Sequence, residues 1–204
     1  MDSEPDQVVE PGIAGVRVLP LRRHEDARGW LAEVYRRAWV PEAGEAVQAN
    51  VSVSRRGVLR GLHFHRRQAD YWCVLSGRAF VGLFDCREGS PTRGHRAELR
   101  LSADAPRALY IPPGVAHGFY AEEDVVLLYL VDRYFTGEDE FGVAWDDPEV
   151  GIAWPARDPV LSERDRSNPP LAALADPPPF RPAGPAAEPP GPSRPAPTGP
   201  GRGP

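Results

Sequence analysis

Short apolar segments separated by turn residues dominate the middle of the chain. Val51-Ser52-Val53-Ser54 alternates between apolar and polar residues with a period of two, as a half-buried strand does. Residues 71–85 form a longer apolar stretch that Ser76-Gly77 divides, so we predict a β-hairpin there. Further strands are expected at residues 109–111, before a Pro-Pro-Gly turn, and at residues 125–131, which are aliphatic and β-branched.

This pattern predicts an all-β domain. Short strands joined by glycine and proline turns are typical of a sandwich or barrel, and a double-sheet jelly roll is the member of that set we expect. No window keeps an apolar period of 3.6 residues over three turns, so any helices should be short and peripheral.

The two ends of the chain differ from the middle. Residues 177–204 hold 12 of the 25 prolines and 5 of the 20 glycines, with Phe180 as the only aromatic residue. Such a segment buries too little apolar surface to offset its conformational entropy, so we predict a disordered tail. We also expect residues 1–11 to be flexible, which leaves one domain over residues 12–176.

Charge and composition exclude several classes of function. The net charge of −5 argues against a protein that binds nucleic acid by neutralising phosphates. No apolar run approaches the ~20 residues that a membrane span needs, and the acidic start lacks the pattern of a secretory signal. Cys73 and Cys86 lie in strand-like apolar runs, so we expect both to be buried free thiols. Free thiols are typical of a reducing compartment, and we therefore expect a cytoplasmic protein. All 24 basic residues are arginine, which excludes Schiff-base chemistry through a lysine.

Two histidine-bearing segments carry the candidate chemistry. His63 and His65 are two residues apart in a predicted strand, so their side chains should lie on one face, near Arg60 and Asp70. Histidines inside a barrel need partners or a function. A second segment, residues 112–119, brings His117 in a Pro-x-Gly-x-x-His turn, and cupin barrels place these two segments side by side.

The motifs around these histidines resemble those of the dTDP-4-dehydrorhamnose 3,5-epimerase family. The resemblance covers roughly residues 15–172, and its motifs come in family order. They are Asp26-Ala27-Arg28-Gly29-Trp30-Leu31-Ala32-Glu33, Gln48-Ala49-Asn50-Val51-Ser52, Gly57-Val58-Leu59-Arg60-Gly61-Leu62-His63, Ser90-Pro91-Thr92 with Gly94, residues 112–119, Asp146-Asp147-Pro148 with Gly151-Ile152-Ala153-Trp154-Pro155, and Leu161-Ser162-Glu163-Arg164-Asp165.

The resemblance implies a cupin jelly-roll barrel, a double-stranded β-helix that works without a cofactor. It implies an isomerase that epimerises C3, C5 or both on a dTDP-4-keto-6-deoxyhexose, in dTDP-rhamnose or related deoxysugar biosynthesis. The C4 ketone acidifies the neighbouring C–H bonds, so a base can remove a proton that returns from the opposite face. By the resemblance, His63 is the base, Asp165 orients it, and Tyr129 is the acid.

The resemblance also implies how the substrate is bound. Arg28 and Arg60 match arginines that contact the diphosphate, a role that suits a planar guanidinium. Other polar residues match positions around the substrate, although several could instead be hydrogen-bonding residues of the barrel wall: Glu33, Gln48, Asn50, His117 and Glu140. The family is dimeric and exchanges strands between barrels, so a homodimer is expected.

The chain departs from the family pattern in the segment after His63 and, farther on, at Phe135, where the family usually has a tyrosine, and at Arg164, where lysine is common. His65 replaces a glutamine, and Asp70 stands where the family has a lysine that stabilises the enolate. These departures support an alternative, because His63, His65, Asp70 and His117 fit the motif of metal-binding cupins. Three histidines and a carboxylate could hold a divalent transition metal and serve an isomerase or a dioxygenase.

A second alternative is a non-catalytic cupin that binds a sugar nucleotide. It would be favoured if Asp165 or Tyr129 pointed away from His63.

Overall fold

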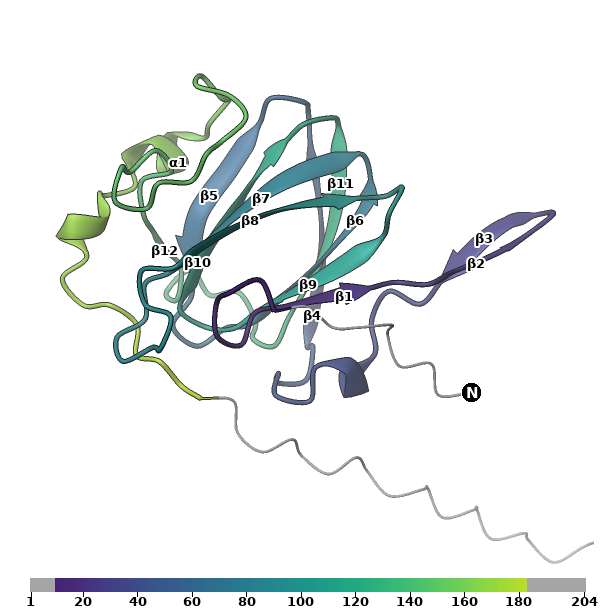
Figure 1. Ribbon diagram of the computed structural model, residues 1–204, viewed down its shortest axis with the longest axis horizontal. Helices are drawn as coiled ribbons and strands as arrows, with labels where there is room; N and C mark the ends of the chain where they lie inside the picture. The colour runs from purple at the N-terminus through teal and green to yellow at the C-terminus, as the bar shows by residue number, and fades with distance from the viewer. Residues whose placement is uncertain (1–9, 183–204) are drawn as a thin grey trace, which may run out of the picture.

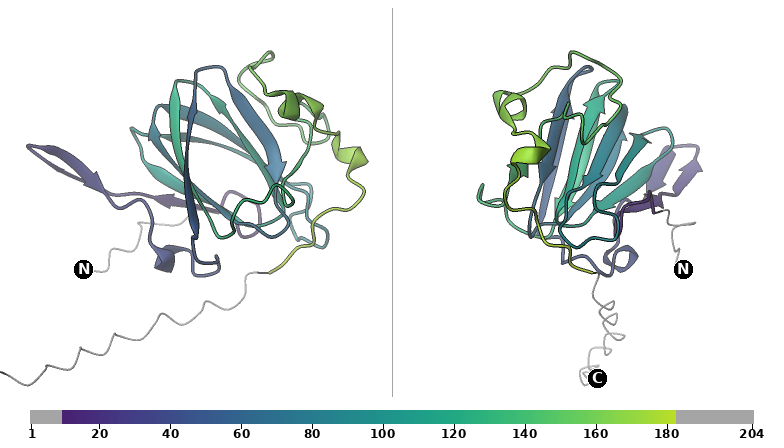
Figure 2. Two further views of the ribbon diagram at one scale, coloured as in Figure 1. Left: turned by 180° about the vertical axis from the view of Figure 1, so that it is seen from behind. Right: turned by 60° about the vertical axis from the view of Figure 1, so that its left-hand side comes forward.

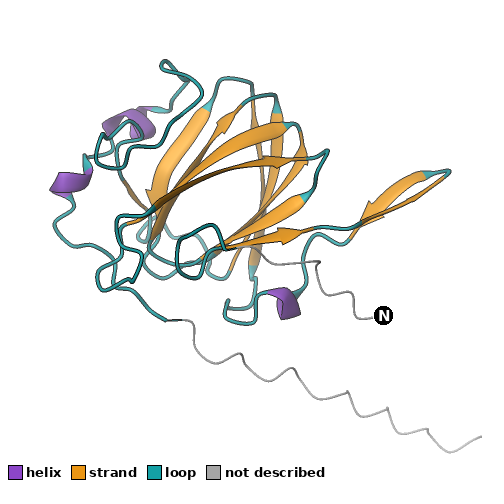
Figure 3. Ribbon diagram, in the orientation of Figure 1, coloured by secondary structure: helices purple, strands orange, loops and turns teal. Residues whose placement is uncertain are grey.

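The computed structural model describes residues 10–182, and almost all of its regular structure is β-strand (Figure 3). The expected all-β fold is confirmed: two five-stranded antiparallel sheets face each other (Figures 1 and 2). In the first sheet the order is β1-β9-β6-β11-β4, and these strands span Arg17–Pro20, Arg107–Ile111, Asp70–Ser76, Val125–Val131 and Gln48–Ser54. In the second sheet the order is β12-β5-β10-β7-β8, and these strands span Phe141–Gly142, Leu59–Phe64, Val115–Ala121, Arg78–Asp85 and Arg96–Ser102.

A separate two-stranded hairpin, β2 (Arg23–Asp26) and β3 (Gly29–Ala32), projects away from the barrel (Figure 1). The helices are short and peripheral, as predicted. They are the 3₁₀ turns η1 (Arg37–Trp39) and η2 (Leu171–Ala173) and the helix α1 (Glu163–Ser167). Within the described part of the chain, no helix has the length and apolar character to cross a membrane.

Side-chain alternation divides the core into three clusters. Between the sheets, inward residues such as Val74, Leu109 and Phe119 form the central cluster. Leu62 and Phe64 of β5 face outward instead and pack under the segment that follows β12. On the outer face of the first sheet, a third cluster includes Tyr71, which packs near η1. Burial on both faces explains why β6, β7 and β10 are nearly continuous apolar runs.

The predicted hairpin at Ser76-Gly77 is wrong. β6 and β7 do not pair, because β6 lies in the first sheet between β9 and β11 while β7 lies in the second between β10 and β8. The chain crosses between sheets at Gly77, whose φ is +78°. A Cβ there would lie 2.0 Å from the carbonyl oxygen of Asp124, so a side chain would collide with backbone.

The described part of the chain includes the first residues of the predicted proline-rich tail. Residues 1–9 and 183–204, which include most of the predicted flexible segments, lie outside the described residues. Residues 177–182 are described: Glu88 N donates to Pro178 O (2.8 Å), and Phe180 N donates to Glu88 O (2.8 Å). Residues 178 and 180 of the predicted tail therefore bond to the backbone of Glu88, in the loop after β7, and the disorder of residues 183–204 stays a prediction.

The two cysteines are free and buried, as predicted. Burial raises the pKa of the Cys73 thiol to about 11 and that of the Cys86 thiol to about 12, so both stay protonated at neutral pH.

Candidate active site

A cavity of about 420 Å³ lies between the two sheets, and inward side chains from both line it. This volume is in the range of small-molecule binding pockets. The structure brings eight of the predicted catalytic and binding residues together in its wall: Gln48, Asn50, Arg60, His63, His117, Tyr129, Glu140 and Asp165.

A bulge in β5 places Arg60 and His63 on the same face although they are three residues apart. His63 is paired with His117 on β10, and Arg60 with Phe119, so one strand advances by three residues and the other by two. Gly61 lies in the bulge with φ at +126°, where a Cβ would lie 2.7 Å from the Cα of Gly118. The glycine in the Gly61-Leu62-His63 motif thus lets β5 and β10 approach closely where the site is built.

His63 and Asp165 form a hydrogen-bonded pair. Nε2 of His63 lies 2.5 Å from Oδ1 of Asp165, across 102 positions of sequence. Asp165 is fixed in turn by Ser162, the N-cap of α1: Ser162 Oγ donates to Asp165 Oδ2 (2.8 Å) and accepts from Asp165 N (3.1 Å). With Nε2 facing a carboxylate, the other ring nitrogen, Nδ1, is left as the basic one.

The electrostatics of this pair keep Asp165 ionised. Burial pushes the pKa of the Asp165 carboxyl upward, but the hydrogen bonds from His63 and Ser162 outweigh it and hold that pKa below its usual value. The ionised carboxylate accepts the ring N–H and so fixes the orientation of the imidazole. This arrangement suits a histidine that must accept a proton.

Tyr129 faces the same cavity from β11, where it is paired with Trp72 on one side and Asn50 on the other. Burial, with the negative charges of Asp70 and Glu140, raises the pKa of the Tyr129 phenol. The hydroxyl therefore remains protonated at neutral pH and can donate a proton.

The remaining polar residues of the wall come from several elements. Arg60 Nε donates a hydrogen bond to Ser54 Oγ (2.9 Å), and this bond fixes the Arg60 side chain against β4. Gln48 and Asn50 are joined by a side-chain hydrogen bond of 3.0 Å. Glu140 forms an ion pair with Arg164 (2.5 Å), so its charge is partly neutralised.

The four residues of the metal-cupin alternative do not form one group. His65, Asp70 and His117 offer ligand atoms that all lie within 4.8 Å of one another, but His63 is outside this set and pairs with Asp165. All three are buried. Burial raises the pKa of the Asp70 carboxyl, and burial with the neighbouring His65 lowers the pKa of His117 to about 3, so His117 is a neutral imidazole.

Two predicted substrate-binding residues lie outside this cavity. Arg28 is in the turn of the β2–β3 hairpin, where it pairs with Asp26. Glu33 follows β3 and pairs with Arg36. Because the hairpin projects away from its own barrel, neither residue lines the pocket of its own chain.

Several wall residues were not predicted from the sequence as site residues. Ser162 and Arg164 line the cavity, as do Gln68 and Phe135. The Ser-x-x-Asp spacing of Ser162 and Asp165 is an N-cap pattern, so the role of Ser162 could have been inferred from it. No comparable signal marks Gln68.

Comparisons with known proteins agree with this geometry. The sequence matches the profile of the dTDP-4-dehydrorhamnose 3,5-epimerase family over residues 10–173. It is 43% identical to the Pseudomonas aeruginosa enzyme of that name, with 76% of this chain and 90% of that protein covered.

Two solved structures extend the likeness to three dimensions. One is the Legionella pneumophila dTDP-6-deoxy-D-glucose-3,5-epimerase with dTDP-4-keto-L-rhamnose (TM-score 0.80, 31% identity, 86% of this chain and 98% of that one). The other is ChmJ, a 3′-monoepimerase from Streptomyces bikiniensis, with dTDP-quinovose (TM-score 0.74, 33% identity, 79% and 86%). The chain therefore belongs to the dTDP-4-dehydrorhamnose 3,5-epimerase family, whose members are enzymes of the isomerase class.

Proposed function

We propose that the chain epimerises a dTDP-4-keto-6-deoxyhexose at C3, C5 or both, in the synthesis of dTDP-rhamnose or a related deoxysugar. The observation that carries this proposal is the His63–Asp165 pair, 2.5 Å apart, in a cavity that Tyr129 also lines. A binding protein has no need of a carboxylate-supported imidazole in the same cavity as a protonated phenol. This favours catalysis over the non-catalytic alternative.

The chemistry follows from these positions. Nδ1 of His63 takes a proton from the carbon next to the C4 ketone, and Asp165 stabilises the imidazolium that forms. Tyr129 returns a proton from the other face, which inverts the carbon centre. The proton transfers themselves use the side chains of His63, Asp165 and Tyr129.

Substrate binding uses the polar wall of the cavity. Arg60 supplies a cation for the diphosphate, since its guanidinium can form two parallel hydrogen bonds to phosphate oxygens. Gln48, Asn50 and Glu140 supply hydrogen-bonding groups around the sugar and base. His117 lies deeper, opposite His63 on the paired strand.

Tyr129→Phe separates proton removal from inversion. We expect the rate of epimer formation to fall by about 10²–10⁴-fold, the usual contribution of a general acid. His63 is intact in this variant, so deuterium from D2O should still enter the substrate. Product configuration and deuterium content are read together by NMR.

Tyr120→Phe is the matched control, because Tyr120 packs in the outer cluster away from the cavity and should change neither rate. Unchanged inversion in Tyr129→Phe would remove Tyr129 from the acid role.

We further propose a homodimer in which the β2–β3 hairpin of one chain reaches the partner's pocket. Val51 and Val53 are 62% and 67% exposed on β4, an edge strand of the first sheet. The hairpin exposes Trp30 and Leu31 as well. Apolar residues on an open edge are typical of an interface, and exchange of the hairpin would bring Arg28 and Glu33 to a substrate.

Val51→Glu tests this interface. A charge in an apolar interface costs free energy on association, so the variant should be monomeric where the wild type is dimeric. Light scattering after gel filtration gives the mass of each. A monomeric wild type at micromolar concentration would contradict the dimer.

We also propose that the protein works in the cytoplasm. Two unpaired, buried cysteine thiols suit a reducing compartment, and the nucleotide-linked substrate belongs there.

A further inference from the structure

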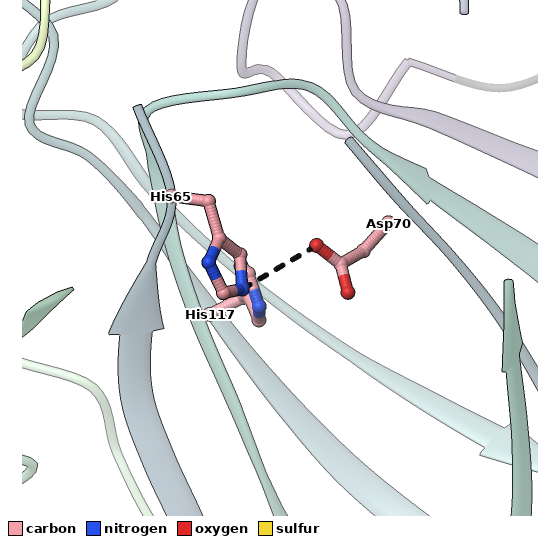
Figure 4. A group of neighbouring side chains, drawn as sticks. All are labelled: His65, Asp70 and His117. Atoms are coloured by element: carbon pink, nitrogen blue, oxygen red, sulfur yellow. Dashed lines mark ion pairs between the residues drawn. The ribbon is translucent and has the colours of Figure 1, made fainter. Parts of the chain in front are cut away.

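His65, Asp70 and His117 form a compact polar cluster that the proton transfers proposed above do not use. His65 follows β5, Asp70 begins β6 and His117 lies on β10, so the cluster joins both sheets (Figure 4). The three residues are 8%, 4% and 4% exposed, and one ligand atom from each lies within 4.8 Å of the others. Such a cluster is costly to bury unless its members are paired or hold a ligand.

The hydrogen bonds of the two imidazoles fix which nitrogen is free. Nδ1 of His65 is 2.6 Å from the carbonyl oxygen of Asp139, and Nδ1 of His117 is 2.9 Å from that of Val115. A carbonyl only accepts, so each Nδ1 carries the proton and each Nε2 presents a lone pair. Metal-binding histidines in proteins are oriented in this way, by donating the other ring N–H to a carbonyl or carboxylate.

The carboxylate of Asp70 completes the set. Its Oδ2 accepts from Gln68 Nε2 (3.2 Å) and lies 3.7 Å from Nε2 of His65, which is beyond hydrogen-bond distance. The cluster thus gathers three atoms that can donate an electron pair to a metal. Two of them, Nε2 of His65 and Oδ2 of Asp70, are too far apart to share a hydrogen bond. Asp139 makes the arrangement rigid, because its carboxylate accepts from the backbone N–H groups of Arg66 and Arg67 (3.0 Å each) and holds the loop after His65.

We propose that His65, Asp70 and His117 bind a divalent transition-metal ion. Two histidines and one carboxylate, with positions left open, are the donor set of a facial triad. Metal–nitrogen and metal–oxygen distances of about 2.0–2.2 Å require the ligand atoms to move together by roughly an ångström, which side-chain rotation can supply. The same three residues line the cavity that contains His63 and Tyr129, so an ion bound there would border the space proposed for the substrate.

The role of the ion rests on the function proposed above. The chain contains no lysine, so no ammonium group can stabilise the charge that develops on the C4 oxygen. A divalent ion at this point would supply that stabilisation as a Lewis acid. Asp70, which would oppose a developing anion as a free carboxylate, has its charge neutralised by the ion.

Metal binding is measured on the full chain without substrate. The protein is stripped with a chelator and dialysed against Zn(II), Mn(II), Co(II) or, without oxygen, Fe(II), and bound metal is measured by mass spectrometry. We expect one ion per chain for at least one of these metals, and a visible Co(II) spectrum if cobalt binds. Asp70→Asn and His65→Gln should each weaken binding at least about tenfold, as loss of a ligand requires.

Asp165→Asn is the matched control, since it removes a buried acid from the same cavity and should leave metal binding unchanged. Circular dichroism identifies any variant that does not fold. A wild type that binds no more metal than a folded Asp70→Asn variant, for every ion tested, overturns the site. Metal binding is read without turnover, so the two proposals fail separately. Epimerase activity in metal-free protein would overturn the Lewis-acid role of the ion but leave the proposed function, whereas metal binding without activity would leave the site but contradict the proposed function.

Discussion

His63→Asn should reduce epimerisation and deuterium exchange by about 10²–10⁴-fold, the contribution expected of a general base. Asparagine keeps a polar group near Asp165 but has no basic nitrogen, so the acidic C–H bond next to the ketone loses its proton acceptor. Binding of dTDP should persist, because Arg60 and the polar residues of β4 are unchanged. Isothermal titration with dTDP and NMR of the substrate in D2O measure the two effects separately.

His95→Asn is the matched control. His95 is exposed, lies outside the cavity and bonds only weakly to Gly12 O (3.3 Å), so its loss should change neither exchange nor binding. Exchange at the wild-type rate in folded His63→Asn would show that another group is the base.

Arg87→Met should lower the free energy of unfolding by about 3–5 kcal/mol, the usual cost of breaking a buried ion pair from one side. Arg87 is 1% exposed and Asp85 is fully buried. Arg87 binds both carboxylate oxygens of Asp85 at 2.8 Å, donates to Ala14 O (2.8 Å) and stacks 4.9 Å from the ring of Phe180. The substitution leaves the Asp85 carboxylate buried without its cation. Urea denaturation measures the loss.

Asp85→Leu combined with Arg87→Met removes both charges and should recover part of the loss, because no uncompensated carboxylate remains. The recovery will be incomplete, since Ser90 and Thr92 also donate to Asp85 (2.6 Å each). A single variant less than about 1 kcal/mol below the wild type would show that the pair contributes as little as a surface pair.

Strand positions could be predicted from local pattern, but strand partners could not. The alternation in Val51-Ser52-Val53-Ser54 identifies β4, and the aliphatic run at residues 125–131 identifies β11. The stretch divided at Gly77 has the pattern of a hairpin, yet its two strands belong to different sheets. A glycine with positive φ serves a hairpin turn and a crossover equally well, so the sequence alone does not separate them.

The candidate site was predicted largely through family motifs. No local signal connects His63 with Asp165, because the two lie on separate elements and only the folded barrel brings them together. Spacing alone predicted that His63 and His65 share a face, and both line the cavity. It could not predict that His63 pairs with Asp165 while His65 joins Asp70 and His117.

Two further features were beyond sequence reasoning. Arginine is usually a surface residue, so nothing in the sequence indicates that Arg87 is buried. Only the folded chain shows that Ser90 and Thr92 of the Ser90-Pro91-Thr92 turn donate to its partner Asp85. Arg28 was predicted near the diphosphate by resemblance, whereas a single chain places it on a hairpin away from its own pocket. In the dimer proposed above, Arg28 would instead lie at the pocket of the partner subunit.

Deuterium uptake by the substrate tests the central claim most directly. The purified wild-type protein is incubated with dTDP-4-keto-6-deoxyglucose in D2O, and the sugar is followed by NMR and mass spectrometry. We predict deuterium at C3, C5 or both, with inversion at each exchanged centre, since a proton removed by His63 is replaced from a group in equilibrium with solvent. Folded protein that binds dTDP but leaves the substrate unlabelled would contradict the assignment of this site as an epimerase.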